Sequence, residues 1–215
     1  PIFLIIGWRG EIKKNYKDEP QHITQGKVTE NFLKNLNIKY KIIDSKCDFK
    51  TVIRNLSQKA RNNNEIVALL VRKNTFEKKI VKKEKVSSLL LREDALDLIT
   101  KKIPKNSIVV STTGILSREL NELIKKNNLK IHNLMCVGGM GHAISIANGI
   151  AINKKKKIFC FDGDGAITMH LGSLATSSKQ KNLIHIVFNN FSHESVGGHD
   201  NSAKHVKFFK LSKEI

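Results

Sequence analysis

The chain contains 215 residues, and its 38 basic and 19 acidic side chains give a formal net charge of +19. This length is enough for one large α/β core or two small ones, and no apolar run approaches the roughly 20 residues that a membrane-spanning helix needs. The 3 cysteines lie far apart without a CxxC pair, which excludes a disulfide framework or a zinc knuckle and predicts a protein of the reducing cytoplasm.

The positive charge is compatible with either a nucleic acid or a small anion as the partner. A nucleic-acid-binding module requires such a charge. However, the lysines are scattered and are not interleaved with aromatic side chains, so we favour solvated basic faces and predict neither a nucleic-acid partner nor a membrane. A field of this sign also attracts small anionic substrates.

Strand-like and helix-like segments alternate along the chain. Strands are predicted at residues 2–8, 38–44, 65–71, 107–113, 158–161 and 184–189. Helices, with apolar residues three and four positions apart, are predicted at residues 25–36, 48–63, 92–102, 117–127, 141–153 and 166–180. Such alternation predicts an α/β fold with parallel sheets flanked by helices.

A charged stretch without a clear period divides the chain. We interpret residues 75–91 as a linker between a first domain at residues 1–74 and a second at residues 92–215. Because the chain begins directly in a strand and ends in an apolar-periodic segment, we expect a piece of a longer protein. The start of the first domain and the end of the second would then be missing.

Polar residues follow two consecutive strands of the second domain. The sequence "DGDG" closes the strand that contains "IFCF", and "NN" closes the strand that contains "HIVF". In a right-handed β-α-β unit both strand ends reach the same edge of the sheet, so Asp164 and Asn190 should be neighbours. Their oxygens suit Mg²⁺, and Gly163 and Gly165 allow the backbone of a ligand site to come close. A helix starting near Ala166 would add its positive end, which predicts a site for a metal-bound diphosphate.

This spacing of GDG and NN resembles the motif of thiamine diphosphate (ThDP)-dependent enzymes. The stretch "HESVGG" that follows resembles the phosphonopyruvate decarboxylase family within them. The resemblance also covers "GWRGE" (7–11), "DEPQHITQG" (18–26), "STTGILSREL" (111–120) and "GGMGHAISIANGIAI" (138–152). It implies two ThDP-binding-fold units: the later part of a pyrimidine-binding domain, followed by a C-terminally truncated diphosphate-binding domain.

The resemblance assigns roles to individual residues. Asp164 and Asn190 would bind Mg²⁺ through their side chains, and Ser192 would bind it through its carbonyl. Gly138 would accept the amino group of the aminopyrimidine, and Met140 would be the apolar wedge that bends the cofactor. The remaining cofactor-binding residues would be Thr112, Thr113, Gly114, Gly141, Gly163, Gly165 and Ala166. The glutamate that activates the cofactor in this family would precede Pro1 and cannot be named.

Three further side chains are catalytic candidates. His22 and His193 would donate protons or bind an anionic phosphonate, the alternative for each being a surface histidine. Glu194 would relay protons or merely cap its loop. Arg9 would hold the phosphonate or form a structural salt bridge. The spacing of six residues between His193, His199 and His205 is not that of one helix face, and we do not interpret it as a zinc site.

The reaction implied by the resemblance is the decarboxylation of 3-phosphonopyruvate to phosphonoacetaldehyde, on the route to 2-aminoethylphosphonate, by a homodimer or a larger assembly. Alternatives are a sulfopyruvate decarboxylase, another ThDP-dependent 2-oxo acid decarboxylase, or a relative that binds ThDP without catalysis. The sulfonate alternative stays open because "GGHDNSAKH" departs from the family pattern after "HESV".

Overall fold

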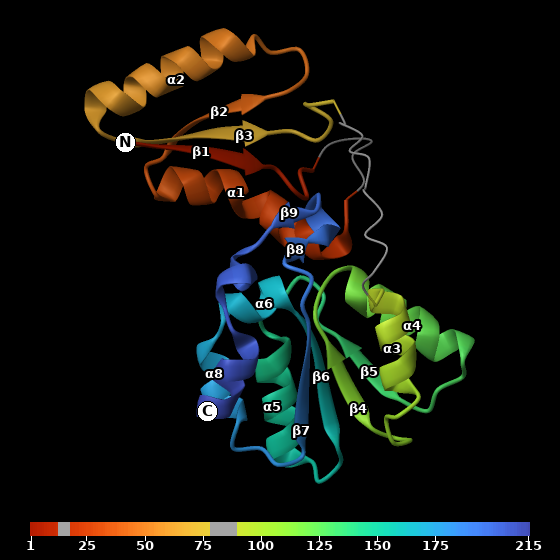
Figure 1. Cartoon of the computed structure of the whole chain (residues 1–215). Helices are drawn as coiled ribbons and strands as arrows, with labels where there is room; N and C mark the ends of the chain where they lie inside the picture. The colour runs from red at the N-terminus through yellow and green to blue at the C-terminus, as the bar shows by residue number, and fades with distance from the viewer. Residues whose placement is uncertain (13–17, 78–89) are drawn as a thin grey trace. The chain divides into compact units, whose positions relative to one another are not determined.

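The computed structural model describes residues 1–12, 18–77 and 90–215. The chain forms two compact units, Pro1–Lys85 and Val86–Ile215. Most of the predicted linker, at residues 78–89, lies outside the described residues. Both units are α/β with parallel sheets flanked by helices, as the sequence predicts (Figure 1). Among the described residues, no helix is both long and apolar enough to cross a membrane.

The first unit contains a three-stranded parallel sheet in the order β1-β3-β2. Its elements are β1 (Ile2–Gly7), a 3-10 turn (Pro20–His22), α1 (Ile23–Asn35), β2 (Lys39–Ile43), α2 (Phe49–Asn63) and β3 (Ile66–Val71). Helices α1 and α2 cover opposite faces of this sheet (Figure 1). Alternate residues of the central strand β3 point to these two faces. Val67, Leu69 and Val71 pack with residues of α2, whereas Ala68 and Leu70 pack with Leu33 of α1.

The second unit contains a four-stranded parallel sheet in the order β5-β4-β6-β7. Its first elements are α3 (Arg92–Thr100), β4 (Ile108–Ser111), α4 (Ile115–Lys126), β5 (His132–Met135), α5 (Ala143–Asn153) and β6 (Ile158–Gly163). The later elements are α6 (Asp164–Met169), α7 (Gly172–Ser177), β7 (Leu183–Phe188), β8 (Ser192–His193), β9 (His199–Asp200) and α8 (Phe208–Glu214), with 3-10 turns at Glu194–Val196 and Ser202–His205.

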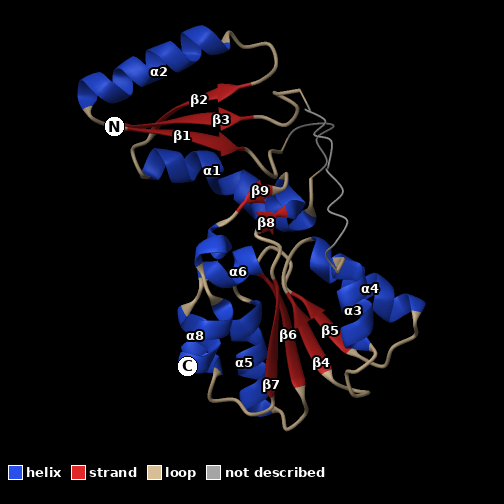
Figure 2. Cartoon of the chain, viewed as in Figure 1, coloured by secondary structure: helices blue, strands red, loops and turns tan. Residues whose placement is uncertain are grey.

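Strand β6 separates two apolar clusters. Phe159 and Phe161 pack with residues of α3 and α4 on one face of the sheet. Ile158 and Cys160 pack with residues of α5 on the other face (Figure 2). This alternation buries both faces of β6, which explains why its sequence is apolar throughout until Asp162.

Two local predictions differ from the structure. Strand β5 is not predicted, because "HNLM" is a short, largely exposed strand at the edge of the sheet. The helix predicted at 166–180 is two short helices that break at His170. The hydroxyl groups of Thr168 and Ser173 bond to the carbonyls of Gly165 and His170, and such local bonds compete with a continuous helix.

Candidate functional site

The carboxyl ends of the four strands in the second unit lie at one edge of the sheet, because all neighbouring pairs are parallel. The chain leaves β4 toward β5 on one side and leaves β6 toward β7 on the other. The loops after β4 and β6 therefore diverge, and open α/β sheets bind ligands at such a switch point. The two loops begin side by side, since the backbone N–H of Thr112 donates to the carbonyl of Phe161 at 2.8 Å.

Asp164 is the most heavily hydrogen-bonded side chain at this edge, and only 4% of it is exposed. One carboxylate oxygen accepts from the backbone N–H of Gly165 at 2.6 Å and from the Asn201 amide at 3.0 Å. The other accepts from the backbone N–H groups of Asn190 at 3.1 Å and Phe191 at 2.5 Å. The structure thus brings Asp164 and Asn190 together at one edge, as the β-α-β geometry predicts.

The donor atoms around Asp164 fit a hard divalent cation. The Asp164 carboxylate, the Asn190 amide oxygen and the Ser192 carbonyl are all oxygen ligands of the kind that Mg²⁺ prefers. The amide oxygen of Asn190, which is exposed, accepts from the backbone N–H of Ser192 at 3.1 Å. Since four N–H donors already occupy the acceptor positions of the Asp164 carboxylate, a cation bound there would replace at least one of them.

The loop after β4 has the properties of an anion-binding turn. The hydroxyl oxygen of Thr112 is buried and has no hydrogen-bond partner among the described residues. Gly114, with φ of +99°, precedes the twelve-residue helix α4, and no side chain in the described parts of the chain caps this helix end. The first N–H groups of α4 therefore lack an intrahelical partner. Thr113 lies in the chain between the Thr112 hydroxyl and these N–H groups. This turn fits a phosphate group.

The glycine-rich loop after β5 packs against α6. Gly138 and Gly141 have φ of +74° and +84°, a region that L side chains rarely adopt. A Cβ atom at Gly141 would lie 2.9 Å from the His170 ring and 3.2 Å from the carbonyl oxygen of Ala166. Met140, half-buried, lies between these two glycines. The structure therefore places the predicted residues of this loop at the same sheet edge as the other predicted residues of the second unit.

The segment from Ser192 to Gly198 lies over the loops after β4 and β6. A Cβ atom at Gly165 would come within 2.6 Å of the His193 ring, and one at Gly114 would lie 3.3 Å from the Ser195 hydroxyl. Only glycine therefore fits at position 165 without displacing the His193 imidazole. His193 is half-buried, and it pairs with His199 across the short β8–β9 ladder.

Glu194 forms an ion pair that the sequence did not suggest. Its carboxylate accepts from the Arg92 guanidinium at 2.5 Å, and the same guanidinium binds both carboxylate oxygens of Glu119 at 2.6 and 2.7 Å. The hydrogen bonds that Arg92 donates to Glu119 and then to Glu194 raise the pKa of Arg92 above its ordinary value. Arg92 starts α3, far from Glu194 in the chain, so no local sequence signal reveals this contact.

His22 belongs to the first unit, where it ends the 3-10 turn before α1. Its Nδ1 lies 2.9 Å from the carboxylate of Asp18. Arg9 binds both oxygens of the same carboxylate at 2.6 and 3.0 Å, and this interaction is the largest cause that holds the pKa of Asp18 well below its ordinary value. Arg9 therefore forms the structural salt bridge that was one of its two predicted roles, although its side chain remains 60% exposed.

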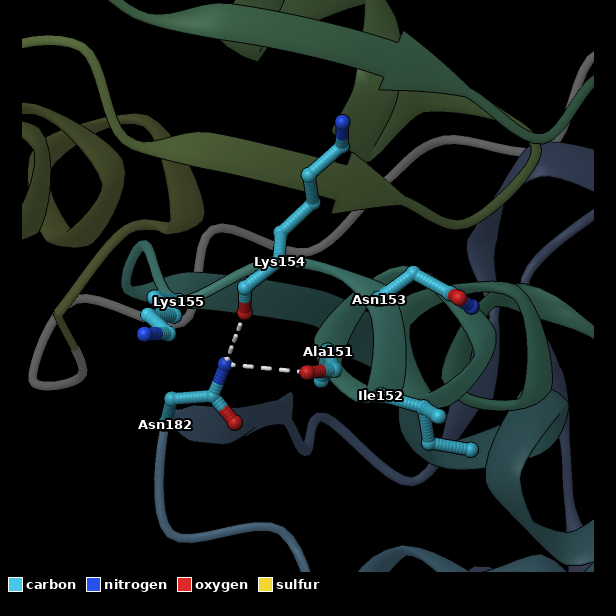
Figure 3. A pocket seen from close by; sticks show the side chains of 6 residues that line it. All are labelled: Ala151, Ile152, Asn153, Lys154, Lys155 and Asn182. Carbon is cyan, nitrogen blue, oxygen red and sulfur yellow. Dashed lines mark hydrogen bonds between the residues drawn. The ribbon is translucent and has the colours of Figure 1, made fainter.

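A separate pocket lies near the amino ends of β6 and β7. It is lined by residues 151–155 and Asn182, and it contains none of the predicted site residues (Figure 3). The Asn182 amide donates to the carbonyls of Ala151 at 3.1 Å and Lys154 at 2.7 Å. These bonds close the end of α5, and a structural role accounts for them.

Comparison with known protein families shows which family the second unit is similar to. Residues 112–214 match the family described as thiamine pyrophosphate enzyme, C-terminal TPP binding domain. This part of the chain is therefore similar to the TPP-binding domains of thiamine pyrophosphate enzymes. The match covers the loops after β4, β5, β6 and β7, which form the sheet edge described above.

The individual proteins that are similar to this chain include phosphonopyruvate and sulfopyruvate decarboxylases. Phosphonopyruvate decarboxylases of Streptomyces viridochromogenes and Streptomyces hygroscopicus are 29% and 28% identical to 92% of the chain, which spans 53% of each of those proteins. The sulfopyruvate decarboxylase subunit beta of Methanocaldococcus jannaschii is 36% identical over 49% of the chain and 55% of that subunit. These matches confirm the predicted resemblance, and the chain spans about half the length of these relatives. No solved structure matches the chain.

Proposed function

We propose that this chain is part of a decarboxylase that requires ThDP and Mg²⁺ and converts 3-phosphonopyruvate to phosphonoacetaldehyde and carbon dioxide. The observation that carries the proposal is the position of Asp164. Its buried carboxylate meets the backbone after β7, at the same sheet edge as the start of α4, in a domain matched to TPP-binding domains. Such a combination suits a divalent cation that holds a diphosphate.

The residues of the sheet edge would divide the binding of the cofactor among them. Asp164, Asn190 and Ser192 would offer oxygens to Mg²⁺. The unpartnered hydroxyl of Thr112 and the first N–H groups of α4 would bind the diphosphate, as would the backbone of Gly165 and Ala166. Gly138 and Met140 would position the pyrimidine and the bend of the cofactor. When bound, ThDP supplies the electron sink that decarboxylation of a 2-oxo acid requires.

Proton transfer is the step that this chain's own side chains would perform. The carbon that loses carbon dioxide must take up a proton before the aldehyde leaves. His193 lies against Gly165, next to Asp164, and we assign it as the proton donor for this carbon. Glu194 would position the His193 loop through Arg92 rather than act on the substrate directly. His22, fixed by Asp18, would be a second proton donor or a phosphonate ligand.

The choice of substrate rests on the relatives. The two Streptomyces proteins similar to most of the chain are named for phosphonopyruvate, which favours the phosphonate. Sulfopyruvate is the second candidate, because relatives named for it match about half of the chain at higher identity. In both substrates the group beside the 2-oxo acid is an anion, which the net charge of +19 would attract.

We further propose that the protein acts in the cytoplasm, in the synthesis of 2-aminoethylphosphonate or a related phosphonate. In this family the active site forms between the pyrimidine-binding domain of one subunit and the diphosphate-binding domain of another, so we propose self-association. A second kind of subunit is the alternative, since the Methanocaldococcus relative is named as subunit beta.

The substrate test compares carbon dioxide release from 3-phosphonopyruvate and 3-sulfopyruvate by the longest natural polypeptide that contains this chain. Release that depends on ThDP and Mg²⁺ and is faster with the phosphonate supports the proposal. A preference for the sulfonate would replace the substrate but keep the reaction. Absence of release from both substrates by folded protein would refute the proposed activity.

The cofactor test uses the purified chain and calorimetric titration with ThDP in the presence of Mg²⁺. Asp164→Asn should weaken binding at least about 100-fold, the upper end of the cost of changes even outside the direct ligands of a metal. Asp97→Asn is the matched control, because Asp97 pairs with Lys101 on the exposed surface of α3. Equal binding by both variants would refute the assignment of Asp164.

A further inference from the structure

A second group of possible metal ligands lies inside the second unit, on the face of the sheet that α5 covers. Cys160 and Asp162 are two residues apart on β6, so their side chains point to the same face. His185 on β7 is the direct register partner of Cys160. The parallel pairing of the two strands therefore brings a thiol, a carboxylate and an imidazole together without any loop.

The ligand atoms of these three side chains all lie within 4.8 Å of one another. Cys160 and Asp162 are fully buried, and the side chain of His185 is only 14% exposed. One Asp162 oxygen accepts from the backbone N–H of Gly163 at 3.1 Å. The other oxygen and the Nε2 of His185 are buried without a hydrogen-bond partner among the described residues.

A direct contact between Asp162 and His185 does not explain the arrangement well. The distance from Nε2 to the carboxylate oxygen is 3.4 Å, longer than the roughly 2.7–3.2 Å of an ordinary N–H···O bond. A buried carboxylate that lacks such a bond is costly. By contrast, ligands about 2.0–2.3 Å from a tetrahedral ion are roughly 3.3–3.8 Å apart, so the observed separation matches one edge of such a tetrahedron.

We propose that Cys160, Asp162 and His185 bind a single Zn²⁺ ion. A thiolate, an imidazole and a carboxylate are ligands typical of zinc. On binding, the ion would form a bond to the Cys160 sulfur and release the thiol proton to solvent, so that binding weakens at low pH. Water or a further side chain would occupy the fourth position.

The helix that covers this face offers a candidate for the fourth ligand. The buried residues of α5, Ala143, Ile144, Ala147, Asn148 and Ala151, form one stripe at helical spacing. Residues of this stripe pack with Cys160 and Ile158. The amide oxygen of Asn148 is buried there without a partner among the described residues. Asn148 is the one polar side chain of that stripe.

The zinc site differs from the proposed Mg²⁺ site in its ligands. Asp164 and its neighbours offer only oxygen, whereas the proposed zinc site includes sulfur and nitrogen. The zinc proposal does not depend on the proposed function, and the two can be tested apart. Asp164→Asn should weaken Mg²⁺-dependent ThDP binding and leave zinc binding intact.

The test titrates the purified, metal-free protein with Co²⁺, a spectroscopic substitute for Zn²⁺, in excess Mg²⁺. We expect a saturating sulfur-to-cobalt charge-transfer absorption that Zn²⁺ then removes by displacement. This absorption should be lost in Cys160→Ser and retained in Cys47→Ser, whose changed residue lies in the first unit. Absence of the absorption from the unaltered protein, or its persistence in Cys160→Ser, would overturn the proposal.

A second variant keeps the proposal testable if Cys160→Ser does not fold. His185→Gln removes the imidazole but keeps the thiol, and circular dichroism checks its fold. We expect its Co²⁺ affinity to fall at least about 10-fold, with a weakened but still sulfur-containing spectrum. Unchanged affinity in folded His185→Gln would exclude His185 as a ligand and thereby overturn the site as proposed.

Discussion

At the scale of single residues, Arg92 stands out because one guanidinium binds two carboxylates from different elements. Glu119 belongs to α4, and Glu194 belongs to the turn that follows His193. The side chain of Arg92 is 20% exposed, so the cluster is shielded from water more than a surface ion pair is. Through Glu194, this ion-pair cluster holds the loop that contains His193 against α3 and α4.

We expect Arg92→Gln to destabilise the second unit by roughly 1–3 kcal/mol, between the costs of breaking exposed and buried ion pairs. Urea unfolding followed by circular dichroism measures this change. Limited proteolysis should also show faster cleavage between residues 192 and 198. Lys101→Gln breaks the exposed pair with Asp97 and should cost under about 1 kcal/mol. Equal losses in both variants would show that Arg92 is an ordinary surface cation.

Asp18 makes the stability of the first unit depend on pH. Its carboxylate accepts from Arg9, from His22 and from the backbone of Gly10, so its pKa in the folded chain lies well below its ordinary value. Between these two pKa values the unfolded chain binds more protons than the folded chain does. The stabilisation is therefore complete above the unfolded pKa of about 3.9 and is lost as the pH falls below it.

We expect Asp18→Asn to destabilise the first unit at neutral pH, and its difference from the unaltered protein to shrink below about pH 4. Urea unfolding followed by the fluorescence of Trp8 measures this change, because Trp8 is the single tryptophan and bonds to Gly26 within this unit. Asp200→Asn, at an exposed pair with Lys204, is the control. A difference that stays constant down to pH 2 would contradict the assigned cause.

At the scale of elements, the structure shows which sequence patterns are sufficient to predict a strand or the nearness of two residues. The continuous apolar runs of β3 and β6 predict buried central strands, because both faces of each strand are covered. Strand β5 was missed, since only its pairing with β4 makes "HNLM" a strand. The nearness of Asp164 and Asn190 followed from topology, whereas the contacts of Arg92 and Asn201 depend on tertiary packing that no local pattern encodes.

Two glycines, Gly141 in the loop just before α5 and Gly149 inside α5, should respond oppositely to alanine. Gly141→Ala should destabilise the second unit by roughly 1–2 kcal/mol or more, because its φ of +84° disfavours a side chain and a Cβ would clash with the His170 ring. Gly149→Ala should stabilise it by about 0.5–1 kcal/mol, because Gly149 lies inside α5 with nothing within 4 Å of an added Cβ. Thermal unfolding of both variants measures these effects. Destabilisation of similar size in both would contradict this prediction.

At the scale of the whole molecule, the charge of +19 is the dominant feature outside the sheet edge. Exposed lysines such as Lys154 and Lys155, which line the pocket in Figure 3, contribute to this charge. We propose that this charge speeds the capture of small anions rather than forming a surface for nucleic acid.

We therefore expect weak binding to duplex DNA with a shallow dependence on salt. A dedicated DNA-binding protein with 6–10 phosphate contacts loses roughly 10³–10⁵ in affinity between 50 and 200 mM salt. This chain should lose far less, as measured by fluorescence anisotropy with a labelled duplex. A basic protein of known DNA affinity is the positive control. A loss of affinity in that range would contradict this expectation and support a nucleic-acid partner.

The two-sided alternation of β6 restricts how the gene can change in length. A residue inserted or deleted within "IFCFDG" would exchange the faces of every later position in the strand. The two phenylalanines would then turn toward α5, and the thiol would turn into the apolar layer beneath α3 and α4. The lysine-rich turn before the strand carries no such alternation. We therefore expect natural length variation to accumulate in that turn and to be absent from the strand.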